Sequence, residues 1–184
     1  MTKNTICKVL PFYTNMDKQR YIQVVIVGAV LLGLIAGYLF AQMRPRHDRT
    51  KGKASVLVLA CIDPRYTNDL AWYLTHNEEL HADYDLFCLA GASLGVTQHT
   101  HAGWKDTFFD HVQLALDLHG IEEIWCFDHL DCGMYKATLG LDEDDDPKVH
   151  SHHMDELASL IKSKHPQLRF KKYMIEVDGA INPM

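Results

Sequence analysis

The first apolar segment of the chain, "YIQVVIVGAVLLGLIAGYLFAQ", covers residues 21–42 and contains no Asp, Glu, Lys, Arg or His. As a helix rising about 1.5 Å per residue, it would cross a hydrocarbon layer about 30 Å thick. Basic residues bound it on both sides: Lys18, Arg20, Arg44 and Arg46. The pattern predicts an N-terminal tail over residues 1–20 and a single transmembrane anchor over residues 21–42, in contact with a lipid bilayer.

Two other interpretations of this apolar segment stay open. A cleaved signal peptide usually has a shorter apolar core and a small-x-small cleavage site, which "YLFAQM" provides poorly. A buried core helix would rarely run this long without a polar face.

Small residues recur at every fourth position of the segment, at Ala29, Gly33, Gly37 and Ala41. Such a stripe would let two membrane helices approach closely, although Gly and Ala are also simply common in membrane helices. Basic residues are denser after the segment than before it, and the positive-inside rule therefore favours a cytoplasmic C-terminal domain.

Residues 43–54 are basic and have no apolar periodicity, as is typical of a linker. Beyond them, apolar runs of strand length alternate with amphipathic segments. The predicted strands cover residues 55–61, 84–91, 121–129 and 170–179, and the predicted helices cover residues 68–80, 104–120 and 154–166. The runs at 55–61 and 84–91 are typical of strands buried on both faces, whereas lysines put the last strand nearer an edge. We therefore expect an α/β domain over residues 55–184, with a mainly parallel β-sheet flanked by helices.

Composition narrows the function classes further. The chain has 184 residues, enough for a domain with a real core, and its net charge of -6 gives no reason to expect nucleic acid as a partner. The chain has five cysteines, an odd number, and they lack the regular spacing of disulfide-rich domains, which argues against a disulfide scaffold. Cys88 and Cys126 lie inside strand runs and are expected to be inert core residues, while Cys7 precedes the anchor without a visible partner.

Cys61, His129 and Cys132 lie at or just after the ends of two predicted strands. In parallel sheets, ligands bind beyond the carboxyl ends of the strands. Two thiolates and an imidazole are good Zn²⁺ ligands, and three protein ligands leave a fourth tetrahedral position open. The H-x-x-C spacing is weak alone, but together the three residues form a candidate zinc site.

Asp63 and Arg65 follow Cys61 in the segment "CIDPR". A carboxylate two residues from a metal ligand could accept a hydrogen bond from a zinc-bound water, and a guanidinium beside it could keep it ionised. The alternative is a turn aspartate paired with a surface arginine, and Pro64 fits such a turn.

The segments "CIDPR" (61–65) and "HLDCG" (129–133) together resemble the C-x-D-x-R and H-x-x-C-G signature of the β-class carbonic anhydrases. The similarity covers most of residues 54–180. "LAGAS" (89–93) resembles the family's Asn-Ala-Gly segment, and "DCGM" is similar to the smaller members of the class.

The resemblance implies Zn²⁺ on Cys61, His129 and Cys132, with Asp63 and Arg65 as the catalytic dyad. It also implies reversible hydration of CO₂ to bicarbonate by zinc-bound hydroxide. In some members the aspartate takes the fourth zinc position and closes the site. Members of the family are dimers or multiples of dimers with the active-site cleft at the subunit interface, so a homodimer or a multiple of one is expected.

The chain departs from the family pattern in three places. Pro64 replaces the usual Ser or Ala, Cys88 to Gly91 replace Arg-Asn-Ala-Gly, and the anchor replaces an N-terminal helix that many members wrap around a partner. Two other functions therefore stay open: hydrolysis of a sulfur analogue such as CS₂ or COS, and a catalytically silent, zinc-stabilised membrane scaffold. A structural zinc site would usually recruit a fourth protein ligand, so the Asp63–Arg65 pair favours an enzyme.

Two groups of histidines lie outside this signature. His150, His152 and His153 follow the acidic run at 142–147 and are expected either in a proton relay or in a solvated loop. His99 and His101 are expected either to line the cleft or to lie in a solvent-facing loop.

Overall fold

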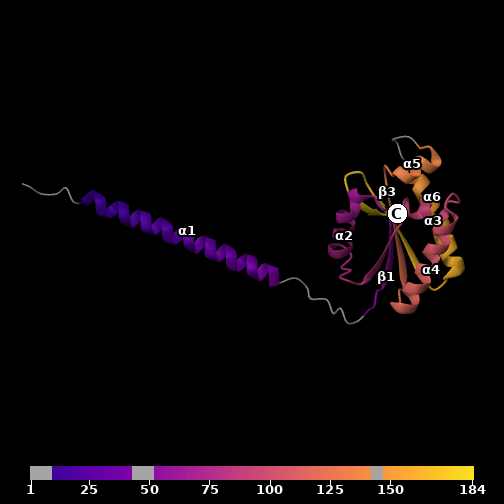
Figure 1. Cartoon of the computed structure of the whole chain (residues 1–184), viewed down its shortest axis with the longest axis horizontal. Helices are drawn as coiled ribbons and strands as arrows, with labels where there is room; N and C mark the ends of the chain where they lie inside the picture. Colours follow the sequence, from indigo (N-terminus) through magenta and orange to yellow (C-terminus); the bar gives the residue numbers. More distant parts are fainter. Residues whose placement is uncertain (1–9, 43–51, 142–146) are drawn as a thin grey trace, which may run out of the picture. The chain divides into compact units, whose positions relative to one another are not determined.

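The computed structural model describes residues 10–42, 52–141 and 147–184. The chain divides into two compact units, residues 1–46 and 47–184. Helix α1 (Leu10–Gln42) makes up the N-terminal unit and begins well before residue 21, so part of the expected tail is helical (Figure 1). Cys7 and residues 43–51 of the expected linker lie outside the described residues.

Within α1, the segment Lys18–Leu39 is long and apolar enough to cross a membrane. None of it is buried, unlike the core helix of a soluble protein, and its large side chains are mostly exposed. A signal sequence near an N-terminus has the same length and composition. A membrane span and a signal sequence therefore both fit α1.

The C-terminal unit is an α/β domain built on a five-stranded sheet of order β2-β1-β3-β4-β5. Its strands are β1 (Val56–Ala60), β2 (Tyr84–Cys88), β3 (Glu123–His129), β4 (Arg169–Ile175) and β5 (Ile181–Pro183). Its helices are the 3₁₀ turn η1 (Pro64–Tyr66), α2 (Thr67–His76), α3 (Ala92–Thr97), α4 (Ala102–Leu118), α5 (Gly133–Leu139) and α6 (Pro147–Lys164). The first four strands are parallel and β5 runs antiparallel to β4, which confirms the predicted fold class.

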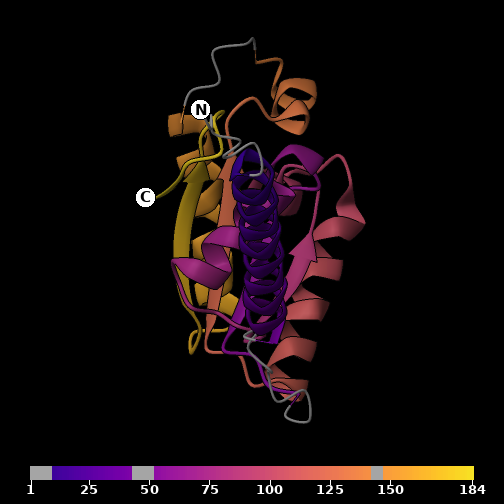
Figure 2. The same ribbon diagram turned by 90° about the vertical axis from the view of Figure 1, so that its left-hand side faces the viewer.

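Helices cover both faces of the sheet. Helix α2 packs on one face, while α3, α4 and α6 pack on the other (Figure 1). Successive residues of β1 point to opposite faces, so that Val58 faces α2 and Leu59 faces the other three helices. Every residue of β1 is buried, as its continuous apolar run predicts. Helix α5 lies beyond the carboxyl ends of the strands in both views (Figures 1 and 2).

The prediction that 84–91 forms a buried strand is wrong, because β2 pairs only with β1 and lies at the edge of the sheet. Leu86 is about half exposed at 52%, and Cys88 is exposed, so Cys88 is not a core residue. Cys126, by contrast, is fully buried as expected. A run of apolar residues does not by itself distinguish an edge strand from a central one, because both can carry the same residue types.

The expected lysine-bearing strand is β4, which is second from the opposite edge and is flanked there by β5. Helix α6 begins at Pro147, earlier than predicted, and therefore carries the histidines at 150, 152 and 153. The acidic residues 142–146 before it lie outside the described residues.

We expect Leu157→Ala to lower the free energy of unfolding by about 2–5 kcal/mol, because Leu157 is fully buried between α6 and the sheet. Leu118→Ala is the matched control, since Leu118 is 64% exposed and should cost no more than about 0.5 kcal/mol. Urea unfolding of the full chain in mild detergent, followed by tryptophan fluorescence, measures both. Equal losses in the two variants would contradict this packing.

Candidate metal centre

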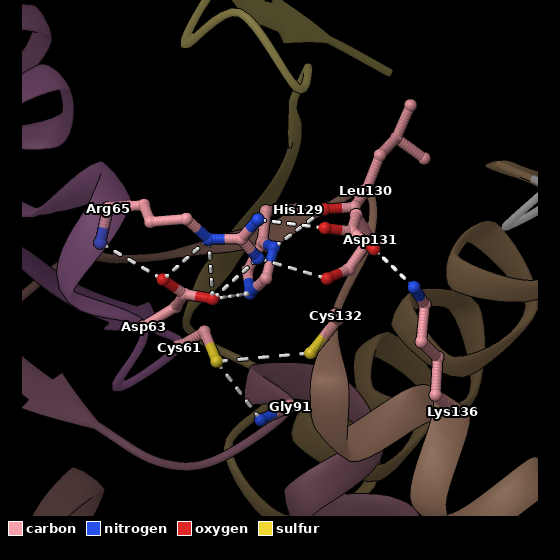
Figure 3. A network of polar contacts seen from close by, with 9 residues as sticks. All are labelled: Cys61, Asp63, Arg65, Gly91, His129, Leu130, Asp131, Cys132 and Lys136. Carbon is pink, nitrogen blue, oxygen red and sulfur yellow. Dashed lines mark hydrogen bonds and ion pairs between the residues drawn. The ribbon is translucent and has the colours of Figure 1, made fainter. Parts of the chain in front are cut away.

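Two adjacent parallel strands deliver the candidate ligands to one edge of the sheet. Cys61 directly follows β1 and His129 is the last residue of β3, and these strands are hydrogen-bonded neighbours. The loop after β3 then turns back so that Cys132 lies at the N-terminus of α5. Because the carboxyl ends of parallel strands meet at one edge, the three side chains converge there (Figure 3).

The distances within the triad suit a tetrahedral ion. Ligand atoms of Cys61, His129 and Cys132 all lie within 4.8 Å of one another. The two sulfurs are 4.0 Å apart, and two sulfurs held about 2.3 Å from a tetrahedral zinc ion would be about 3.8 Å apart. Among the described residues, this is the only group of three or more His, Cys, Asp or Glu side chains so placed.

His129 presents an unsatisfied nitrogen to the two sulfurs. Its Nδ1 lies 2.8 Å from the Leu130 carbonyl and donates to it, which leaves the lone pair on Nε2. The Nε2 atom is buried and has no hydrogen-bond partner, an arrangement that costs free energy unless another group occupies the site. A metal ion would satisfy this nitrogen, so Cys61, His129 and Cys132 could hold one.

The pKa values of the two thiols are shifted in opposite directions. The thiol of Cys132 is within hydrogen-bond reach of the Cys61 sulfur, and this contact is the largest cause that lowers the pKa of Cys61, with the Gly91 N–H adding to it. The Gly91 N–H lies 3.3 Å from the Cys61 sulfur. The pKa of Cys132 is raised, first because of the same contact with Cys61. A thiolate is therefore readily formed at Cys61, and thiolate is the form that binds metal.

Asp63 and Arg65 form a close ion pair beside the triad. The guanidinium donates from Nε to both Asp63 oxygens, at 3.1 and 3.2 Å, and from a terminal nitrogen at 2.8 Å. These bonds hold the pKa of Asp63 below its usual value. Asp63 Oδ2 lies 3.9 Å from His129 Nε2, so an ionised carboxylate borders the fourth side of the triad.

Asp131 is a site residue that sequence reasoning missed. It accepts from Arg65 at 2.8 Å through its carboxylate and at 3.0 Å through its backbone carbonyl, and it also pairs with Lys136. These partners, Lys136 first, lower the pKa of Asp131 to about 2. Arg65 thus joins the loop of Cys61 to the loop of Cys132. The only signal in the sequence is an acidic residue next to a candidate ligand.

An apolar cavity of about 100 Å³ opens beside the triad. It is bordered by Cys61, Asp63 and His129 and by side chains of η1, α2 and β2: Tyr66, Leu70, Leu74, Tyr84, Leu86 and Cys88. Its volume exceeds that of a single bound water. Tyr66 packs its ring 4.7 Å from that of His129, and its buried hydroxyl has no hydrogen-bond partner among the described residues. The cavity therefore favours small, apolar molecules.

None of His99, His101, His150, His152 and His153 lines this cavity. His99 and His101 are exposed, and His101 stacks on Trp104. His150 is buried on α6, where a solvated loop was one expectation, and lies 3.2 Å from Asp128. His153 lies 2.9 Å from Thr97.

We expect the purified full chain to retain one Zn²⁺ per chain after dialysis against a weak chelator, because all three ligand atoms converge. Cys132→Ser should lose that ion, since it removes one of two thiolates. Cys88→Ser is the matched control, because Cys88 lines the same cavity outside the triad. Elemental analysis measures the stoichiometry, and equal zinc in both variants would show that the ion binds elsewhere.

Comparison with known sequences leaves the function open. No family model matches the chain. An uncharacterized protein of Rickettsia bellii is 28% identical over 144 residues, which cover 76% of this chain and 87% of the relative. A second uncharacterized protein, from Rickettsia conorii, is 28% identical over 139 residues, covering 73% of this chain and 74% of the relative.

Comparison with solved structures identifies the fold. A tetrameric β-carbonic anhydrase from Sordaria macrospora superposes with a TM-score of 0.54 at 11% identity, covering 88% of this chain and 97% of the other. At this identity the likeness concerns the backbone and not the chemistry. The chain has the fold of the β-carbonic anhydrases.

Proposed function

We propose that this chain is a membrane-anchored, zinc-dependent carbonic anhydrase that interconverts CO₂ and bicarbonate. One observation carries the proposal: a Cys-His-Cys triad with an unpaired imidazole nitrogen opens towards an ion-paired aspartate and an apolar cavity. A structural zinc site would instead be closed by a fourth protein ligand. Among the described residues, no further His or Cys joins the triad.

Different residues of the chain would bind the metal ion and orient the attacking water. Cys61, His129 and Cys132 would hold Zn²⁺, which when bound supplies a nucleophile at neutral pH by acidifying water. Asp63, kept ionised by Arg65, would accept a hydrogen bond from the attacking water and orient it. The net reaction converts CO₂ and water to bicarbonate and releases one proton to solvent.

The cavity walls support a small apolar substrate. Side chains of α2 and β2 surround it, and they offer little hydrogen bonding to a polar ligand. CO₂ has no net dipole and would gain from this environment, while the bicarbonate anion would be poorly solvated by these apolar walls and would leave to solvent. CS₂ and COS share the linear shape of CO₂ and are the competing substrates.

Assembly into a homodimer, or a multiple of one, is part of the proposal. The edge strand β2 pairs on one side only. Exposed apolar side chains lie just after the ends of β1 and β4 (Ile62 and Val177), on α2 (Trp72) and on β2 (Leu86). A second copy would cover such a surface and enclose the cavity.

We expect zinc-loaded full chain in detergent to hydrate CO₂ in a stopped-flow assay, and Asp63→Asn to lower the rate by about 10²-fold, because the attacking water would lose the group that orients it. Asp106→Asn, on the exposed face of α4, should leave the rate unchanged. Release of sulfide from CS₂ or COS by the zinc-loaded protein, without hydration of CO₂, would show that a sulfur analogue is the substrate. Protein inactive on all three would be a scaffold.

We expect the full chain to stay in the membrane pellet after alkaline carbonate extraction, because Lys18–Leu39 is long and apolar enough to span a bilayer. A chain that begins at residue 47 should be released into the supernatant. Intact mass of the membrane form checks the alternative, since removal of residues 1–42 would identify a cleaved signal peptide. We propose that the C-terminal domain lies on the cytoplasmic side, as the flanking basic residues favour.

A further inference from the structure

A fully buried carboxylate lies on the face of β3 opposite to His129. Asp128 is 1% exposed and faces α3, α5 and α6, whereas His129 faces the cavity. The Asp128 oxygens accept hydrogen bonds from the Ser93 N–H at 3.0 Å, the Ser93 hydroxyl at 2.5 Å, the Tyr135 hydroxyl at 2.7 Å and His150 Nδ1 at 3.2 Å, and a weaker one from the Cys126 thiol at 3.8 Å. Ser93, Tyr135 and His150 are themselves fully buried. We call Asp128, Ser93, Tyr135 and His150 the Asp128 network.

The network includes residues beside the turn that contacts the Cys61 sulfur and beside the turn that carries Cys132. Ser93 lies in the first turn of α3, two residues after Gly91, whose N–H donates to the Cys61 sulfur. Tyr135 lies in the first turn of α5, three residues after Cys132. A single side chain therefore fixes the turn that contacts one sulfur and the turn that bears the other.

We propose that Asp128 is a positioning residue for the metal centre, which sets the separation and direction of the Cys61 and Cys132 sulfurs without contacting either. The inference rests on the proposed zinc binding by the same triad. Partners that orient metal ligands typically change metal affinity by about 10–100-fold when they are mutated.

The alternative is that the network only stabilises the core, and its geometry argues against this. A buried carboxylate needs several donors, and apolar residues of similar shape would fill the same space with no such requirement. Three of the donor residues, Ser93, Tyr135 and His150, lie in the first turns of helices that begin at the metal end of the sheet: α3, α5 and α6. A role in core packing alone would not require hydrogen-bond donors from the first turns of three helices that all begin at the metal end of the sheet.

The test compares metal binding in three variants of the full chain in detergent. Asp128→Asn keeps the shape but puts an NH₂ group among donors, so it should weaken Zn²⁺ binding by about 10–100-fold in chelator competition. Ser93→Ala and Tyr135→Phe each remove one hydroxyl and should give smaller losses in the same direction. Each should also shift the visible absorption bands of the Co²⁺-loaded protein, which report ligand geometry.

Leu157→Ala is the control, because it weakens the packing of α6 in the core and removes none of the groups that donate to Asp128. It should lower the stability of the metal-free protein and leave zinc affinity and the Co²⁺ spectrum unchanged. Should Asp128→Asn fail to fold, the two hydroxyl variants decide the matter alone.

Wild-type affinity and spectrum in the folded variants would overturn the positioning role while leaving zinc binding intact. A wild-type chain that binds no zinc would overturn the proposed function, and the positioning role with it.

Discussion

The site depends on the parallel pairing of β1 with β3, in which Val56 to Ala60 lie opposite Glu123 to Phe127. This register brings the carboxyl ends of both strands to the same edge, and the chain places one metal-binding side chain at each end. A parallel pair requires a crossover connection, and here residues between the strands form α2, β2, α3 and α4. The burial of β1 and β3 between two helical layers therefore holds Cys61 and His129 in place.

Charged and polar side chains surround the candidate metal ligands at the carboxyl ends of β1 and β3. The thiols and the unpaired imidazole nitrogen form a site that favours a cation. Arg65 lies outside them and pairs with Asp63 on one loop and Asp131 on the other. Asp128 lies behind them, fully buried and supplied with donors. Hydrogen-bonded acidic groups thus lie on two sides of the three ligands, while Cys61 and Cys132 pack with the apolar side chain of Leu94, and the cavity walls are apolar as well.

Much of the fold and the candidate site could be predicted from sequence, for identifiable reasons. Long continuous apolar runs predicted β1 and β3, and their ends located Cys61 and His129, because strand direction and ligand position follow from the parallel α/β pattern. The short helices α3 and α5 escaped prediction because six or seven residues are too few to show helical periodicity. The edge position of β2 escaped too, since its apolar residues resemble those of a buried strand.

Asp128 and Asp131 were also beyond prediction, because their partners come from distant segments such as Ser93, His150 and Arg65.

X-ray absorption at the zinc edge of the purified full chain tests the central claim, zinc binding by Cys61, His129 and Cys132, most directly. The account predicts two sulfurs at about 2.3 Å and two nitrogen or oxygen neighbours at about 2.0 Å. A shell of four sulfurs, or one with none, would contradict it.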